Sequence, residues 1–70
     1  MEGIGIGGVM AEVAWLASKG KPVLEHILVA GLCGRFDVPR DRAKAAIALA
    51  ESCGVIERTG NQVFLKGRPR

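Results

Sequence analysis

The side chains best suited to binding are basic, and most of them lie in the second half of the chain. Residues 35–70 carry eight Lys and Arg side chains against four Asp and Glu, whereas residues 1–34 carry two against three. A basic half attracts polyanions, and nucleic acid is the commonest polyanionic partner of proteins. The alternative interpretation of the same charges is a solvated surface that ends in a basic tail.

Few side chains are suited to catalysis or to metal binding. His26 is the only histidine, and Cys33 and Cys53 are the only cysteines. A structural zinc ion takes four such ligands, and a catalytic histidine needs a partner group to activate. We therefore expect no catalytic residue, no metal, no cofactor and no small-molecule substrate, and we interpret both thiols as small buried apolar groups. The chain is not expected to be an enzyme.

The first residues contain the glycine-rich pattern of dinucleotide-binding loops. Residues 3–8 read G-x-G-x-x-G. In a dinucleotide site this loop joins a strand to a helix, and only two residues precede it here. We interpret residues 1–8 as a flexible glycine-rich leader, because each glycine in a helix costs about 1 kcal/mol relative to alanine. This interpretation leaves the apolar residues Ile4 and Ile6 exposed and without a role.

Hydropathy indicates a chain that lies outside the membrane. No apolar run approaches the roughly 18 residues of a membrane span, and the start lacks the basic and apolar regions of a signal peptide. We expect a cytoplasmic location, at the nucleoid if the chain binds DNA.

Apolar residues make up 49% of the chain, and a domain of this size buries only about 60% of its surface. Self-association into a homodimer is a possible use of the remaining apolar surface.

Apolar spacing predicts three helices, over residues 9–20, 22–34 and 39–54. Lys21 to Val23 form an extended link, and residues 35–38 are expected to form a turn in which Phe36 and Val38 fill the core. The third helix has small and aliphatic residues at spacings of three and four, which define its buried face. These residues are Ala43, Ala46, Ile47, Ala50 and Cys53.

A β-hairpin is expected after the third helix. Residues 55–58 and 62–65 are rich in β-prone side chains, and Thr59-Gly60-Asn61 separates them. Gly followed by Asn is a hairpin signal, because both residues tolerate a positive φ. Gly54 is expected to end the third helix in the left-handed conformation.

The order of these elements is that of a winged helix-turn-helix domain. The second and third helices form the helix-turn-helix, and the hairpin is the wing. The fold class is therefore mainly α with a small β-hairpin, a three-helix winged helix-turn-helix. One domain is expected over residues 9–66, followed by a basic tail over residues 67–70.

A more specific resemblance covers residues 36–65. This segment, FDVPRDRAKAAIALAESCGVIERTGNQVFL, resembles the C-terminal winged-helix (gamma) domain of FtsK/SpoIIIE-type DNA translocases. The resemblance implies binding of double-stranded DNA through the third helix, with Arg42 at a base-reading position. Asp41, Ala45 and Ala48 depart from the family, which has asparagine and longer polar side chains there. The matching residues are Phe36, Val38, Asp41-Arg42-Ala43, Ile47, Glu51 and Gly54-Val55-Ile56.

The residues themselves also predict DNA binding. Three bases lie in the first turn and a half of the third helix, where helix-turn-helix proteins read bases and where the helix dipole disfavours positive charge. Polar wing side chains and a basic tail can contact phosphates without specifying sequence. We therefore predict a transcription-regulating domain that binds double-stranded DNA with low to moderate sequence specificity. The predicted contacts are Arg35, Arg40, Arg42, Lys44, Arg58, Thr59, Asn61, Gln62, Lys66, Arg68 and Arg70.

The alternative is a winged helix that serves as a protein–protein interaction or dimerisation module. The outward face of the third helix is small, so another helix could approach it closely. Several apolar residues outside the predicted core would add to such a contact. The residues that support this alternative are Ile4, Ile6, Met10, Trp15, Ala45, Ala48 and Ser52.

Overall fold

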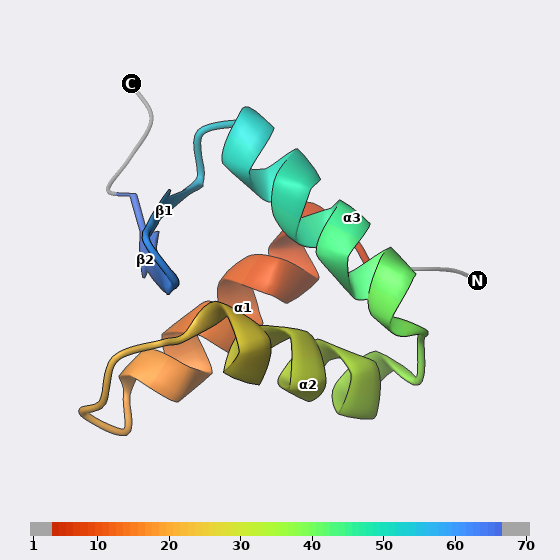
Figure 1. The fold of residues 1–70 in the computed structure, drawn as a ribbon, viewed down its shortest axis with the longest axis horizontal. Coiled ribbons are helices and arrows are strands. Elements are labelled where there is room, and N and C mark those ends of the chain that lie inside the picture. The colour runs from red at the N-terminus through yellow and green to blue at the C-terminus, as the bar shows by residue number, and fades with distance from the viewer. Residues whose placement is uncertain (1–3, 67–70) are drawn as a thin grey trace.

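Three helices followed by a two-stranded antiparallel hairpin make up the fold of the computed structural model, which describes residues 4–66 (Figure 1). The predicted three-helix winged helix-turn-helix arrangement is confirmed. The longest of these helices has 13 residues, so none of them can cross a bilayer, which takes roughly 20 apolar residues. The elements are α1 (Ile6–Ala17), α2 (Glu25–Phe36), α3 (Arg40–Ser52), β1 (Ile56–Thr59) and β2 (Gln62–Leu65).

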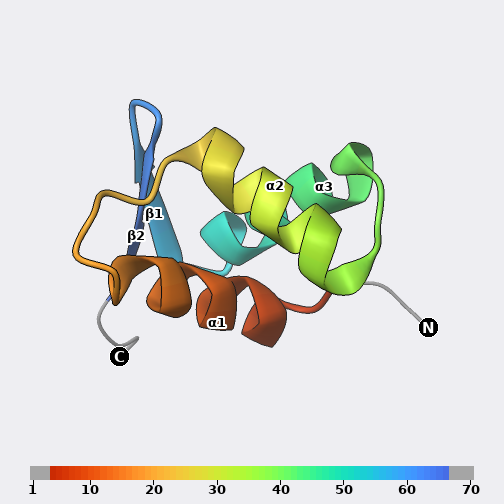
Figure 2. The ribbon, with the colours of Figure 1, turned by 90° about the horizontal axis from the view of Figure 1, so that it is seen from below.

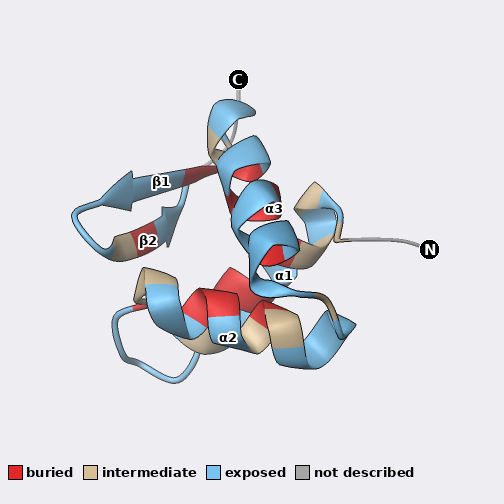
Figure 3. Cartoon of the chain, turned by 45° about the vertical axis from the view of Figure 1, so that its right-hand side comes forward, coloured by how far each residue is buried: buried red, intermediate tan, exposed pale blue. Residues whose placement is uncertain are grey.

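All three helices and both strands contribute to one apolar core. The buried residues lie on the inward sides of the helices and at one position of each strand (Figure 3). Ala43, Ala46, Ile47 and Ala50 form the buried face of α3, as their spacing predicts. Cys53 is exposed, contrary to prediction, because α3 ends at Ser52 and Cys53 follows the last helical turn. Cys33 of α2 is only partly buried.

The predicted leader over residues 1–8 is too long, because α1 already begins at Ile6. Gly5 is the N-cap residue, and its carbonyl accepts hydrogen bonds from the amides of Gly8 and Val9 at 3.1 and 3.2 Å. Ile4 and Ile6 pack against the core. Their burial offsets the poor helix propensity of the glycines, and it gives both isoleucines a structural role.

A close contact between α1 and the end of α2 requires a glycine at position 8. A Cβ atom on Gly8 would lie 2.9 Å from the ring of Phe36, closer than carbon atoms pack. Phe36 was expected in a turn and in the core, but it is the last residue of α2, which continues past the predicted stop at Gly34, and its side chain is 37% exposed. Asp37 adopts the left-handed conformation, with φ 56° and ψ 51°, which short polar side chains tolerate.

The extended link before α2 pairs with the hairpin. The amide of Val63 donates to the carbonyl of Val23 at 2.8 Å, the amide of Glu25 donates to the carbonyl of Asn61 at 2.7 Å, and Leu24 forms an antiparallel bridge with Gln62. These bonds hold the link extended, so α2 begins at Glu25 rather than at the predicted Pro22. The hairpin stands beside the start of α2 for the same reason (Figure 2).

The hairpin turns at Gly60 and Asn61 as predicted, but β1 covers residues 56–59 instead of the predicted 55–58. Thr59 pairs with Gln62, which leaves Gly60 and Asn61 as a two-residue loop. Gly60 has φ 64°, whereas Asn61 is not among the residues with positive φ. A positive φ at the first loop residue alone is the pattern of a type II′ turn, in which glycine is favoured at that position. Gly54 ends the α3 segment with φ 79°, also as predicted.

Candidate nucleic-acid interface

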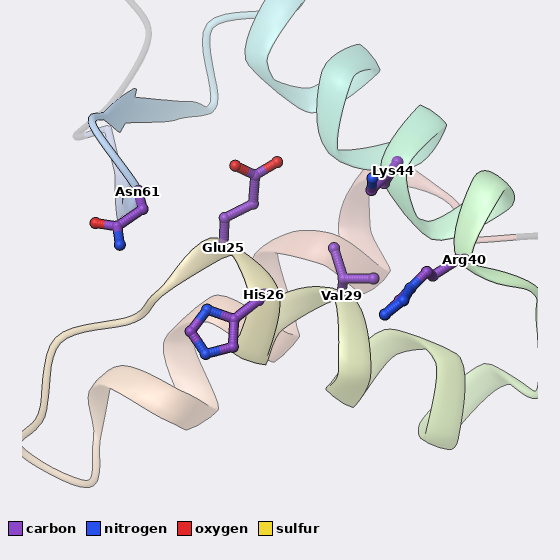
Figure 4. A pocket seen from close by; sticks show the side chains of 6 residues that line it. All are labelled: Glu25, His26, Val29, Arg40, Lys44 and Asn61. Atoms are coloured by element: carbon purple, nitrogen blue, oxygen red, sulfur yellow. The ribbon is translucent and has the colours of Figure 1, made fainter.

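A groove of about 340 Å³ lies between the start of α2, the first two turns of α3 and the hairpin turn (Figure 4). Three of its residues belong to the predicted site: Arg40 and Lys44 of α3 and Asn61 of the turn. The groove is completed by three residues of α2 that sequence reasoning missed as site residues. They are Glu25, His26 and Val29.

Arg40 and Lys44 lie on the same flank of α3, one turn apart. Both side chains are exposed, and neither has an ion-pair partner among residues 4–66. Pro39, the N-cap residue, provides no side-chain hydrogen bond to the first turn. Each positive charge near a helix N-terminus is unfavourable by about 0.3–1 kcal/mol. An anionic ligand in the groove would offset this cost.

Arg42 lies on the other flank of α3. It lies two positions before Lys44, which is about 200° around the helix, and it does not line the groove. Like the groove bases, it is exposed and has no ion pair within the described part of the chain. Between the two flanks, the outward surface of α3 is formed by the exposed residues Asp41, Ala45, Ala48 and Ser52. The three predicted helix bases are therefore divided between two sides of the helix.

Arg58 is already bound to two carboxylates. Its Nε donates to Oε1 of Glu51 at 2.9 Å, and its Nη1 donates to Oε2 of Glu25 at 2.7 Å. Glu25 begins α2 and Glu51 lies in the last turn of α3. The predicted DNA contact at Arg58 is thus part of an ion-pair network that connects the hairpin with two helices.

Arg35 lies outside the groove and forms an ion pair with Glu12. Its Nε is 2.5 Å from Oε1 of Glu12, whose side chain is only 2% exposed. The guanidinium also lies 5.4 Å from the centre of the Trp15 ring. A buried carboxylate is costly unless it is paired, so Arg35 stabilises the contact between α1 and α2. The structure does not bring Arg35 together with the other predicted site residues.

The remaining predicted contacts are on or after the hairpin. Thr59 and Lys66 are exposed and Gln62 is partly buried, and none of these three lines the groove. The amide of Lys66 donates to the carbonyl of Val55 at 3.0 Å, so the chain leaves β2 close to the start of β1. Arg68 and Arg70 lie outside the described residues.

No metal site is formed by the described residues, because residues 4–66 contain no cluster of three or more His, Cys, Asp or Glu side chains with suitable placement. Comparisons of the chain with protein-family models, with curated proteins and with solved structures find no match. The resemblance of residues 36–65 to the translocase gamma domain therefore stays a prediction from sequence.

Proposed function

We propose that this domain binds double-stranded DNA through α3 and the hairpin turn, with the phosphate backbone beside the groove. The observation that carries the proposal is that Arg40, Lys44, His26 and Asn61 line the same groove (Figure 4). These side chains offer cationic and neutral hydrogen-bond donors from three elements within one concave surface. Phosphate contacts from such side chains fix the register of a protein on a duplex.

The two flanks of α3 suit the two walls of a major groove. The groove of B-DNA is about 12 Å wide, and a helix with its side chains is about 10–12 Å across. Arg40 and Lys44 on one flank and Arg42 on the other can each reach a phosphate strand. The outward surface between them has alanine at positions 45 and 48, which form no hydrogen bonds to base edges, and Asp41 is its only charged side chain. Low to moderate sequence specificity follows from this composition.

This activity would suit a small transcription regulator or a DNA-binding module of a larger protein. Either would act at the nucleoid in the cytoplasm. A homodimer, if formed, would present two copies of α3 to successive turns of the major groove. Neither use requires an enzymatic activity.

Fluorescence anisotropy with a labelled random-sequence duplex tests the proposal. We expect binding that weakens between about 50 and about 200 mM salt, because each phosphate contact contributes a slope of about −0.9 in log affinity against log salt. The double variant Arg40→Ala/Lys44→Ala should bind at least about tenfold more weakly. The matched control is Lys19→Ala/Lys21→Ala, which removes the same charge from exposed positions outside the groove. Absence of wild-type binding at low salt, or equal losses in both double variants, would contradict the proposal.

A protein–protein function is the second candidate, and specific exposed apolar residues favour it. Leu49 of α3 is 53% exposed, and Phe64 and Leu65 of β2 are exposed beside an apolar groove of about 210 Å³ between α1 and β2. Ile4 and Ile6 do not support this candidate, since both pack against the core. Light scattering distinguishes the candidates: a stable dimer without salt-sensitive DNA binding would favour the second.

A further inference from the structure

Arg58 fixes the hairpin against both helices that border the groove. Its two ion pairs, at 2.7 Å to Glu25 and 2.9 Å to Glu51, reach the start of α2 and the end of α3 from one guanidinium. The planar guanidinium holds its donors in a rigid fork, so two bonds in different directions restrict the tilt of β1. Ile56, two residues earlier on the same face of the strand, is buried, so this face of β1 is turned toward the helices.

The same guanidinium neutralises negative charge at the proposed DNA site. Glu25 lines the groove together with Arg40 and Lys44 (Figure 4). With Arg58 in place, the groove bases and Arg58 supply three positive charges against the two carboxylates of Glu25 and Glu51. Without Arg58 the positive and negative charges are equal in number, and an unpaired Glu25 would repel a phosphate group.

We propose that Arg58 is a positioning residue that contacts no phosphate itself. It holds the hairpin turn at the groove, and it keeps Glu25 and Glu51 from repelling the DNA backbone. This inference rests on the proposed DNA-binding function. It differs from the expectation from sequence, in which Arg58 contacts phosphate directly.

Charge-removing variants distinguish the two roles. In the anisotropy assay, Arg58→Gln should weaken duplex binding about tenfold, because it exposes two carboxylates beside the backbone. The triple variant Glu25→Gln/Glu51→Gln/Arg58→Gln should recover affinity to within about threefold of wild type and keep the wild-type salt slope, because the repelling carboxylates are removed and no phosphate contact is lost. The remaining loss of affinity measures the contribution of the two bridges that hold the hairpin. Arg58→Lys keeps the charge but not the fork, so its affinity should lie between those of wild type and Arg58→Gln.

The opposite pattern would overturn the proposal. If the triple variant binds as weakly as Arg58→Gln and its salt slope is reduced by about 0.9, Arg58 is itself a phosphate ligand. Wild-type affinity in Arg58→Gln would equally exclude a positioning role. Circular dichroism of every variant checks that the fold is retained.

Hydrogen exchange in the free protein tests the positioning role without DNA. The amides of Glu25 and Val63 bond across the junction of the link and the hairpin, so they report on its opening. In Arg58→Gln these amides should exchange about tenfold faster, whereas the amides of Val13 and Leu32 in the core should change by no more than about twofold. If the wild type binds no DNA, the proposed function fails while faster exchange still supports the positioning role. Unchanged exchange at Glu25 and Val63 would overturn that role.

Discussion

Arginine side chains lie both at the contact between α1 and α2 and in the groove beside α3. The arginine at the helix contact is paired with a carboxylate of the chain, whereas the basic side chains of α3 in the groove are not paired within the part of the chain that the structure describes. At the helix contact, Arg35 is bound to the buried Glu12 and lies near Trp15. At the groove, Arg40 and Lys44 have no carboxylate partner within residues 4–66. The first arrangement is complete within the chain, whereas the second would be completed by an external anion. Pairing, rather than the number of bases, therefore distinguishes a structural arginine from a candidate ligand-binding one.

Removal of Arg35 gives the largest expected change in this comparison. Arg35→Ala leaves Glu12 buried without its partner, and we expect a loss of about 1–3 kcal/mol in the free energy of unfolding. The estimate lies below the value for a fully buried pair, because the Arg35 side chain is 50% exposed. Urea denaturation measures the loss. Duplex affinity, determined where the variant is folded, should stay at the wild-type value; a clear decrease would place Arg35 in the DNA site.

Single substitutions on the two flanks of α3 sharpen the assignment of the groove. Lys44→Ala should weaken duplex binding by up to about tenfold, equivalent to about 1.4 kcal/mol, and Arg42→Ala by about threefold. Both changes affect exposed side chains, so the free energy of unfolding should change by less than about 0.5 kcal/mol. Equal losses of affinity would indicate that both flanks of α3 contact the duplex equally. A larger loss in Arg42→Ala would indicate that DNA binds mainly on the Arg42 flank and not at the groove.

Two glycines with positive φ allow a matched test of the hairpin turn. Gly60 in the hairpin has φ 64° and Gly20 in the loop after α1 has φ 79°, and added Cβ atoms would meet no neighbouring group at either position. Gly60→Ala and Gly20→Ala should each reduce the free energy of unfolding by about 1 kcal/mol, through backbone strain alone. Only Gly60→Ala should also lower duplex affinity. Thermal unfolding and anisotropy together provide both readouts, and equal affinities would argue against a role for the hairpin turn.

Leu49 gives the smallest expected effect on stability. Leu49→Ser removes an exposed apolar side chain, and the free energy of unfolding should change by less than about 0.5 kcal/mol. If α3 mediates self-association, the same change should dissociate the dimer in analytical ultracentrifugation. If the wild-type protein is monomeric at all concentrations tested, self-association through α3 is excluded.

The order and type of the elements could be predicted from local signals. Apolar residues at spacings of three and four define α3, and the Gly60-Asn61 pair defines the hairpin turn. The boundaries of α1 and α2 depended on contacts that are distant in sequence. Burial of Ile4 and Ile6 extends α1, and pairing of Val23 with Val63 delays the start of α2.

The candidate site was only partly predictable, for the same physical reason. Arg40, Lys44 and Asn61 were recognised by residue type and position in their elements. His26 was interpreted as a lone helix residue, because its proximity to α3 and to the hairpin exists only in the folded chain. The ion pairs of Arg35 and Arg58 span 23 residues to Glu12 and 33 residues to Glu25, so no local pattern indicates them.

The bridge between Leu24 and Gln62 has a consequence for the way the chain acquires its structure. The carbonyl of Val23 and the amide of Glu25 have their partners in residues 61–63, so the link before α2 is held extended only once the hairpin exists. On a ribosome, α2 and α3 would emerge before the strand residues that pair with this link. This pairing closes the loop that contains α2 and α3, and closure of so long a loop costs more chain entropy and is slower than the formation of contacts within one helix.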